Sequence, residues 1–552
     1  MKKVSKLLKF SGVCLLMQAV SVGVITGLFV VLFKISITKL FGVVQACSYL
    51  LPLITALGGL ISGYVVYKFA PETKGSGIPY VKASLMHLGN LTRVRSIFVK
   101  FIGGVASIGT GMSLGREGPS VQLGAGSGAL IGKVFKLRGT DKDKLISAGA
   151  GSAIAATFNA PISGAIFVLE ELMQKFNSTV LFPVIIATVV AASVARTFLG
   201  DNTSFIIPLH KTDLNILICL LTGIISGFAG VLYSKLIHFN NFFFSKIRIK
   251  PYYKTCIAGF VIGFIGLFVP LVLGSGNDAV EILLQYKLSI LMVVLVFLAK
   301  FILTPFCFGS GAVGGIFLPM LMIGCYLGYI VGVLSNFASV EIDLIAISLV
   351  GMASFLAAVA RTPITATVMV FEMTGAYNFI LPIMLACAVA DLIAESCHHK
   401  SIYSELIVFG AKNSPAAKYL ETKTVSNIMK KMYKTIPQNY PVKDVLKKMK
   451  QDNQSFYLVV DDFDKLKGTF QKQDAEDVII NCDNEKLCVK DVMGMNTVVT
   501  NENANLYEIF FELHMSNMNE AVVLDINEKV VGIVERSDLE KILMPYLRQE
   551  NC

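Results

Sequence analysis

The sequence predicts a polytopic α-helical membrane protein with a soluble α/β domain at its C-terminal end. Of its 552 residues, 54% are hydrophobic and only 16% are charged. Soluble globular chains carry about 25% charged residues, so this chain must keep most of its surface away from water. A bilayer-crossing helix needs about 20 apolar residues. Six runs reach or approach that length, namely 11–33, 50–68, 179–199, 214–235, 256–273 and 288–304.

The N-terminus is basic and is followed by an apolar run without a clear small-residue cleavage site. We therefore interpret this run as a retained first helix and not as a signal peptide. Positive residues beside a membrane helix favour the cytoplasm, so we expect a cell-membrane protein with both termini cytoplasmic. The basic residues are Lys2, Lys3, Lys6 and Lys9.

The composition changes near Phe409, where the apolar runs stop. Lys412, Asn413, Ser414 and Pro415 then begin a polar stretch typical of a linker. We predict a membrane domain over 1–410, a linker over 411–422 and a soluble domain after it. The soluble part has a net charge of −3 (19 basic, 22 acidic) and the rest +14 (30 basic, 16 acidic). Positive-inside loops or an anion pathway explain the basic excess, and nothing supports nucleic-acid binding.

The membrane part contains an internal duplication. The Gly-Ser-Gly segment at 75–77 recurs at 274–276, and the stretch 149–170 recurs at 351–372. Between these blocks, Gly115, Pro119, Gly124 and Gly128 recur as Gly315, Pro319, Gly324 and Gly328. Three ordered blocks at nearly one offset predict two related halves, over about 11–200 and 210–405.

Duplicated halves with interrupted helices are typical of transporters whose site lies between the repeats, near the middle of the membrane. Irregular backbone at that depth is tolerated only where it is buried in protein or lines a cavity. The repeated Gly/Pro blocks therefore indicate the site. Glycines beside a helix start let backbone N–H groups converge, and the helix N-terminus favours an anion. The alternative is that these blocks merely kink packed helices.

These blocks resemble the anion-site motifs of the CLC family of chloride channels and chloride/proton antiporters. The motifs are GSGIP at 75–79, GREGP at 115–119 and GIFLP at 315–319, and Tyr403 has the context of the family's last membrane segment. The resemblance spans about residues 10–410. It implies a CLC-type inverted-repeat fold of about 18 helices, many interrupted, and a homodimer with one anion pathway per subunit.

The resemblance also implies the residues of the site. Chloride would be bound by Ser76, Ile316, Phe317 and Tyr403. The backbone and helix N-termini around it would be supplied by Gly75, Gly77, Gly115, Arg116, Gly118 and Gly315. The serine favours chloride over nitrate, because nitrate-preferring members tend to have proline there.

Two carboxylates carry the expected proton chemistry. An ionisable residue inside a membrane is a functional candidate, and the resemblance makes Glu117 the gating glutamate that competes with chloride. A structural ion pair with Arg116 is the alternative. Glu170 recurs as Glu372 and is interpreted as structural, whereas Glu171 has no counterpart. The resemblance makes Glu171 the internal proton relay and favours exchange; an exposed carboxylate at a helix end is the alternative.

The soluble domain is duplicated at an offset of 64 and resembles a pair of CBS domains over 423–546, with copies at 423–482 and 488–546. Each copy is expected to contain a helix, two strands and an aspartate that opens another helix. Asp474 and Asp538 match the ribose-binding aspartate of adenosine-binding members. Glu535 stands where a small hydroxyl residue is common, which leaves binding of an adenine nucleotide open.

The first interpretation is therefore a chloride/proton antiporter, with a passive chloride channel of the same fold as the alternative. No enzyme, resident cofactor or metal site is expected. An intramembrane zinc protease needs His-Glu-x-x-His, and none of the six histidines is followed by Glu. A divalent-cation transporter would need several carboxylates along its path.

Overall fold

The computed structural model describes most of the chain. The described residues are 2–86, 91–137, 139–174, 178–201, 203–205, 215–286, 288–411, 415–452, 456–471, 487–494, 497–516, 518–539 and 541–542. They divide into two compact units, Met1–Ile407 and Val408–Cys552. Asp474 lies outside the described residues.

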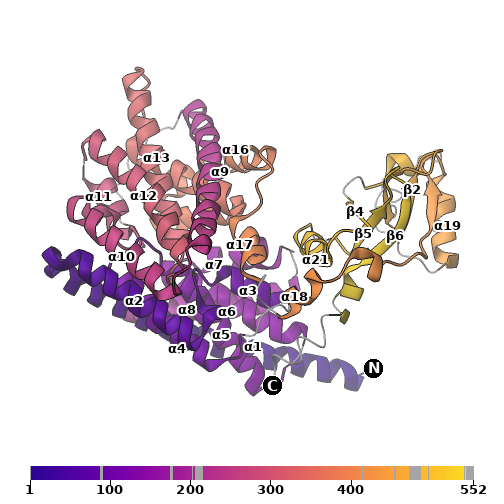
Figure 1. Ribbon diagram of the computed structural model, residues 1–552, viewed down its shortest axis with the longest axis horizontal. Coiled ribbons are helices and arrows are strands. Elements are labelled where there is room, and N and C mark those ends of the chain that lie inside the picture. The colour runs from indigo at the N-terminus through magenta and orange to yellow at the C-terminus, as the bar shows by residue number, and fades with distance from the viewer. Residues whose placement is uncertain are drawn as a thin grey trace. The chain divides into compact units, whose positions relative to one another are not determined.

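The first half of the membrane unit runs from α1 to α8 and is coloured indigo to magenta in Figure 1. Its helices are α1 (Lys2–Ala46), α2 (Leu51–Phe69), α3 (Ile78–Leu85), α4 (Val94–Gly109), α5 (Glu117–Val134), α6 (Thr140–Phe158), α7 (Pro161–Phe167) and α8 (Ser178–Leu199). A π-helical segment, η3 (Val168–Met173), follows α7.

The second half repeats this order of elements. Its helices are α9 (Ile216–Lys246), α10 (Pro251–Phe268), α11 (Asn277–Gln285), α12 (Ile290–Ser310), α13 (Phe317–Phe337), α14 (Leu344–Ala360), α15 (Pro363–Thr374) and α16 (Ile380–Ser396). The chain then continues into α17 (Ile402–Ala411). The pairing of helices is repeated too: α5 packs on α6 and α13 on α14, while α1 packs on α8 and α9 on α16.

Eight helices of the described part are long and apolar enough to cross a membrane. Six of them coincide with the expected runs, and the other two are Phe317–Phe337 and Tyr377–Ser396. One run extends well past the end of its helix. The run 256–273 contains a helix that ends at Phe268, because Val269, with φ −132° and ψ 77°, precedes a proline and leaves the helical conformation.

The repeated glycines allow neighbouring helices to approach closely. A methyl group on Gly124 would overlap the carbonyl oxygen of Gly149, and one on Gly128 would overlap that of Leu145. In the second half, Gly324 and Gly328 have the same relation to α14. The glycine spacing found in the sequence therefore reflects the packing of α5 on α6 and of α13 on α14.

The two halves cap each other's short helices. Glu170 accepts hydrogen bonds from the backbone N–H groups of Ile364 (3.1 Å) and Thr365 (2.6 Å) at the start of α15. Glu372 accepts the equivalent bonds from Ile162 (3.1 Å) and Ser163 (2.7 Å) at the start of α7. A carboxylate is the favoured partner of a helix N-terminus. This exchange across the repeat confirms that Glu170 is a structural residue.

The soluble unit contains two three-stranded sheets, each with two antiparallel strands and one short parallel strand. The first has β1 (Thr435–Pro437), β2 (Phe456–Val460) and β3 (Leu466–Gln471), with helix α19 (Val442–Asp452). The second has β4 (Val498–Asn501), β5 (Glu520–Leu524) and β6 (Val530–Glu535), with helix α21 (Leu506–Met515). The helix α18 (Pro415–Glu421) precedes the first copy.

The two copies of the soluble unit exchange edge segments. Lys430, before the first sheet, forms reciprocal backbone hydrogen bonds with Ile533 of β6 (2.8 and 3.0 Å). Gly494, 64 residues later in the chain, does the same with Thr469 of β3 (3.0 and 2.8 Å). The expected helix and two strands are present in each copy, and residues 536–539 form the expected helix after β6. The corresponding segment after β3 lies outside the described residues. The sequence interpretation missed β1 and β4, which have only three and four residues.

The reciprocal caps predict matched effects on stability. We expect Glu170→Ala and Glu372→Ala each to lower the free energy of unfolding by about 1–2 kcal/mol, because each leaves backbone donors at a helix start without their acceptor. The chain has no tryptophan, so thermal unfolding in detergent is best followed by far-ultraviolet circular dichroism. The exposed Glu341 provides the control Glu341→Ala, and a loss no larger than that of this control would contradict the capping role.

Candidate anion and proton site

The breaks of the two halves meet at a backbone bridge. Gly115 and Gly315 donate N–H groups to each other's carbonyl oxygens, both at 2.6 Å, as an isolated antiparallel pair. Directly after these glycines, α5 begins at Glu117 and α13 at Phe317. A methyl group on Gly315 would touch the backbone nitrogen of Gly118. The starts of α5 and α13 are thereby held side by side.

The third expected motif, residues 75–79, lies beside the same backbone bridge. The backbone N–H of Gly314 donates to the carbonyl oxygen of Gly75 (3.1 Å), and the side chain of Ser76 lies against Gly118. Gly75 and Gly77 have φ angles of +67° and +102°, which glycine adopts without strain. The segments 75–79, 115–119 and 315–319 are therefore adjacent in the fold.

One buried lysine holds the loop before α3, and another holds the equivalent loop before α11. Lys100 donates to the carbonyl oxygens of Thr73 (2.9 Å) and Gly75 (2.7 Å). Lys300 donates to those of Val272 (2.9 Å) and Gly274 (2.7 Å). Both lysines are fully buried. The sequence interpretation missed them, although their offset of 200, equal to that of Gly115 and Gly315, could have revealed them.

Several buried polar groups around the three breaks have no hydrogen-bond partner among the described residues. They include the hydroxyls of Ser76 and Tyr403 and the side-chain amide of Gln122. Ser76 is 2% exposed, and Tyr403 is fully buried. Buried donors without partners are rare in folded proteins and require an explanation such as a bound ion. Gln122, whose side chain lies against Gly77, was not expected from the sequence.

Ile316 and Phe317 stand at the start of α13, and both are fully buried. The Phe317 ring packs against Phe158 (centroids 5.9 Å apart) and Phe167 (6.1 Å). The aromatic contacts hold the first turn of α13, whose free N–H groups favour an anion. The arrangement of these elements can therefore bind a dehydrated anion with backbone amides and hydroxyls.

Glu117 is fully buried and folds back over Gly115 toward the start of α13. Its oxygens interact with the backbone N–H groups of Glu117 itself and Leu318, but neither oxygen has a well-formed hydrogen bond among the described residues. The Arg116 Nε lies 4.0 Å from Oε1 and has no hydrogen-bond partner in the described part of the chain. This separation argues against the alternative of a tight structural pair with Arg116.

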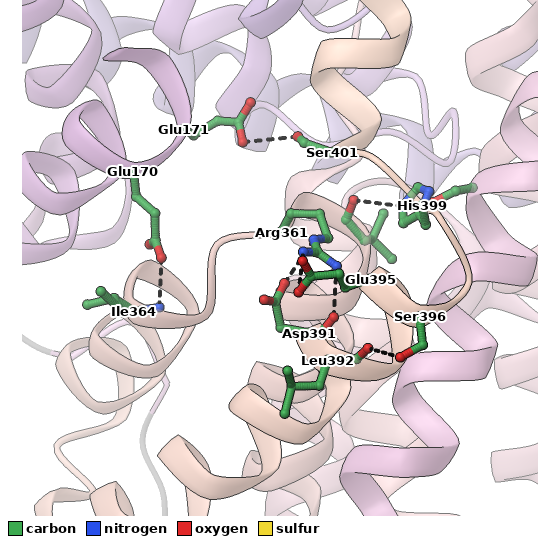
Figure 2. Close-up of polar contacts among 12 residues, drawn as sticks. Glu170, Glu171, Arg361, Ile364, Asp391, Leu392, Glu395, Ser396, His399 and Ser401 are labelled. Carbon is green, nitrogen blue, oxygen red and sulfur yellow. Dashed lines mark hydrogen bonds and ion pairs between the residues drawn. The ribbon is translucent and has the colours of Figure 1, made fainter. Parts of the chain in front are cut away.

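Glu170 and Glu171 are adjacent in sequence but have different partners (Figure 2). Whereas Glu170 caps α15, Glu171 is 1% exposed and accepts hydrogen bonds from Lys82 (2.7 Å) and Ser401 (3.0 Å). The alternative of an exposed carboxylate at a helix end is therefore wrong. Lys82, from α3, was not anticipated, and its buried ammonium is the main contact of this carboxylate.

The sequence of this chain matches a known protein family. The family model described as "Voltage gated chloride channel" matches residues 58–395. The chain belongs to the voltage gated chloride channel family. The matched range contains the bridged glycines, Glu117 and the buried pair of Lys82 and Glu171, so the geometry above is that of a member of this family.

Relatives and solved structures agree with this assignment. The H(+)/Cl(-) exchange transporter ClcA of Vibrio vulnificus is 34% identical over 426 residues, which cover 73% of this chain and 91% of that protein. The ClcA of Yersinia pestis is 36% identical and covers 71% and 87%. A slow cyanobacterial Cl-/H+ antiporter matches with TM-score 0.68 and 29% identity over 72% of this chain and 98% of that one. A eukaryotic CLC transporter shares the fold, with TM-score 0.65 and 19% identity over 95% and 97%.

The soluble unit of this family member matches CBS domains at residues 425–480 and 489–545. Asp538 stands in the first turn after β6 and pairs with Lys430 (2.7 Å) and Lys541 (3.2 Å). Partial desolvation opposes the shift, but the hydrogen bonds from both lysines lower the pKa of the Asp538 carboxyl. A ribose would have to compete with two ammonium groups for this carboxylate.

The buried lysines predict a paired effect on the stability of this family member. We expect Lys100→Met and Lys300→Met each to cost about 2–4 kcal/mol of unfolding free energy, because each leaves two buried carbonyl oxygens without their side-chain donor. Thermal unfolding in detergent measures the effect. Lys235→Met, at an exposed position of α9, is the control. A Lys100 or Lys300 variant as stable as this control would contradict the role of these lysines in holding the loops.

Proposed function

We propose that this protein exchanges chloride for protons across a membrane, as a secondary active antiporter. The observation that carries the proposal is the meeting of three helix starts around buried hydroxyls, with the carboxylate of Glu117 folded over the same place. The relatives named as H(+)/Cl(-) exchange transporters and the cyanobacterial Cl-/H+ antiporter support it.

The chloride site is proposed to lie among the hydroxyls of Ser76 and Tyr403 and the backbone N–H groups of Ile316 and Phe317. The glycines of the three motifs keep the backbone free of side chains there. Partial charges of N–H groups and hydroxyls bind an anion without a full positive charge, and binding that is favourable but weak permits release. This explains how the site can pass chloride rather than trap it.

Glu117 is proposed to couple the two ions. Ionised, its carboxylate occupies the N–H donors at the start of α13 and excludes an anion from them. Protonated, it loses this attraction and leaves the donors to chloride. Arg116 holds no hydrogen bond through Nε to this carboxylate, so the side chain is free to leave without breaking a hydrogen-bonded ion pair.

Glu171 is proposed to relay protons on the cytoplasmic side. Its burial and its bonds to Lys82 and Ser401 distinguish it from the capping residue Glu170. The phenol of Tyr403 interacts electrostatically with both Glu171 and Glu117, which supports a proton route that passes near the anion ligands.

Several further features are proposed from the resemblance to this family. The active form would be a homodimer with one pathway in each subunit, embedded in the cell membrane. The lysines at the N-terminal end of α1 support a cytoplasmic N-terminus, and the CBS pair would then lie in the cytoplasm too. No cofactor is proposed, and the engaged state of Asp538 argues against an adenine nucleotide as a required ligand.

Flux measurements on the purified chain in liposomes test exchange against passive conduction. We expect a chloride gradient to drive protons uphill and a proton gradient to drive chloride uphill. We expect Glu117→Gln to abolish proton movement while chloride flux continues, because a neutral amide cannot exchange protons. Glu171→Gln should have the same outcome. Chloride flux without proton movement in the unaltered chain would instead favour the passive channel.

The role of Ser76 predicts a change in ion preference. We expect Ser76→Pro to shift selectivity from chloride toward nitrate, because the substitution removes a hydroxyl donor from the proposed site. The ratio of nitrate to chloride flux in liposomes measures this change. Ser84→Ala, in the helix α3 that follows Ser76, is a suitable control because the Ser84 hydroxyl donates to the backbone carbonyl oxygen of Tyr80. An unchanged flux ratio in Ser76→Pro would exclude Ser76 as a ligand.

A further inference from the structure

The ammonium of Lys82 joins three elements of the membrane unit. From α3, Lys82 donates to Glu171 of η3 (2.7 Å) and to the hydroxyl of Ser404 in α17 (2.6 Å). The Ser401 hydroxyl donates to the second oxygen of the same carboxylate (3.0 Å). The side chains of Lys82 and Glu171 are each 1% exposed. The pair is thus a dehydrated link and not a surface ion pair.

Each end of this link is next to a proposed chloride ligand. The helix α3 begins at Ile78, two residues after Ser76, and Lys82 lies about 6 Å along the helix axis from that start. On the other side, the two serines Ser401 and Ser404 flank Tyr403 in the chain. A change in the charge balance of the pair therefore changes the electrostatic potential where the anion would bind.

Few other charges act on Glu171. Among the described residues, the ionisable groups that interact with it are Lys82, Tyr403 and its neighbour Glu170, and Glu170 is held by α15. The helix α7 carries no ionisable side chain. The helix α6 has its charged residues in its first turn, where Asp141 pairs with Lys144 (2.8 Å). Lys82 is thus the cation that balances the Glu171 carboxylate.

We propose that Lys82 is a positioning residue that couples the internal proton site to the chloride site. While Glu171 is ionised, it neutralises the ammonium. When Glu171 takes up a proton, the ammonium keeps its charge without a counter-charge and attracts chloride to the hydroxyl donors beside it. The inference rests on the proposed exchange function and assigns a residue to its coupling.

The physical basis is the cost of an unbalanced charge in a dehydrated site. Removing one partner of a buried ion pair is strongly unfavourable, because the remaining charge is poorly solvated. An anion nearby can restore the balance, and the attraction is not damped as it would be in water. By linkage, a proton that favours chloride binding is itself favoured by bound chloride to the same extent. Lys82 would thus make the two ions bind together from the cytoplasmic side.

Chloride binding to the purified full chain, titrated calorimetrically from chloride-free buffer, tests the inference. All variants carry Glu117→Gln, which removes the competing gate carboxylate. In this parent, we expect Glu171→Gln to tighten chloride binding about fivefold or more, because the amide mimics the protonated acid. Adding Lys82→Met should abolish the gain, whereas Lys82→Arg should preserve it.

A matched control separates the charge from the hydrogen bond. Ser404→Ala removes the neutral partner of Lys82 but leaves its charge, so the gain from Glu171→Gln should remain. The inference is overturned if Glu171→Gln does not tighten chloride binding, or if the gain survives Lys82→Met. The comparison of Glu171→Gln with the parent retains Lys82. A lack of tighter chloride binding there therefore overturns the inference even if Lys82→Met does not fold.

The outcome also distinguishes this inference from the proposed function. A parent chain that binds no chloride would overturn both. Chloride binding and coupled flux in the unaltered chain, together with no gain from Glu171→Gln, would overturn only the role of Lys82. A gain that requires the charge of Lys82 would support it.

Discussion

The fold depends on satisfying backbone groups at helix breaks that have no access to water. Each unsatisfied N–H or C=O in such a place costs several kcal/mol. Gly115 and Gly315 satisfy each other's backbone groups through their reciprocal hydrogen bonds, while Lys100 and Lys300 donate hydrogen bonds to the loops before α3 and α11. The N–H groups left over at the starts of α5 and α13 are then the ones available to an anion.

The duplication supplies both the partners and the direction of these contacts. Because Gly115 and Gly315 pair antiparallel, each half donates to the other the same backbone hydrogen bond that it accepts. The caps repeat this logic: Glu170 stabilises α15, and Glu372 stabilises α7. The proposed proton relay lies where the symmetry fails, since Met373 stands at the position that would match Glu171. Only one half therefore carries the buried carboxylate that Lys82 balances.

Much of this architecture could be predicted from the sequence. Apolar runs, the glycine offsets and the family motifs indicated the halves, the breaks and most site residues, because backbone geometry imposes Gly and Pro at fixed positions. The partners of buried charges could not be predicted. Lys82 and Glu171 are 89 residues apart in the chain, and no local pattern reveals which lysine meets which carboxylate. The strands β1 and β4 were missed because three or four residues are too few for a periodic signal.

The position of Lys82 suggests why a buried ion pair is retained at this site. Such a pair seldom adds stability over an apolar packing of equal volume, because both charges lose their hydration. A pair whose charges cancel in one protonation state and not in the other is different, since proton uptake then leaves an uncompensated positive charge at a fixed place. In this chain that place is flanked by Ser76 at one end of the link and by Tyr403 at the other. A stabilising role alone would not require a link between the helix that follows Ser76 and the helix that carries Tyr403.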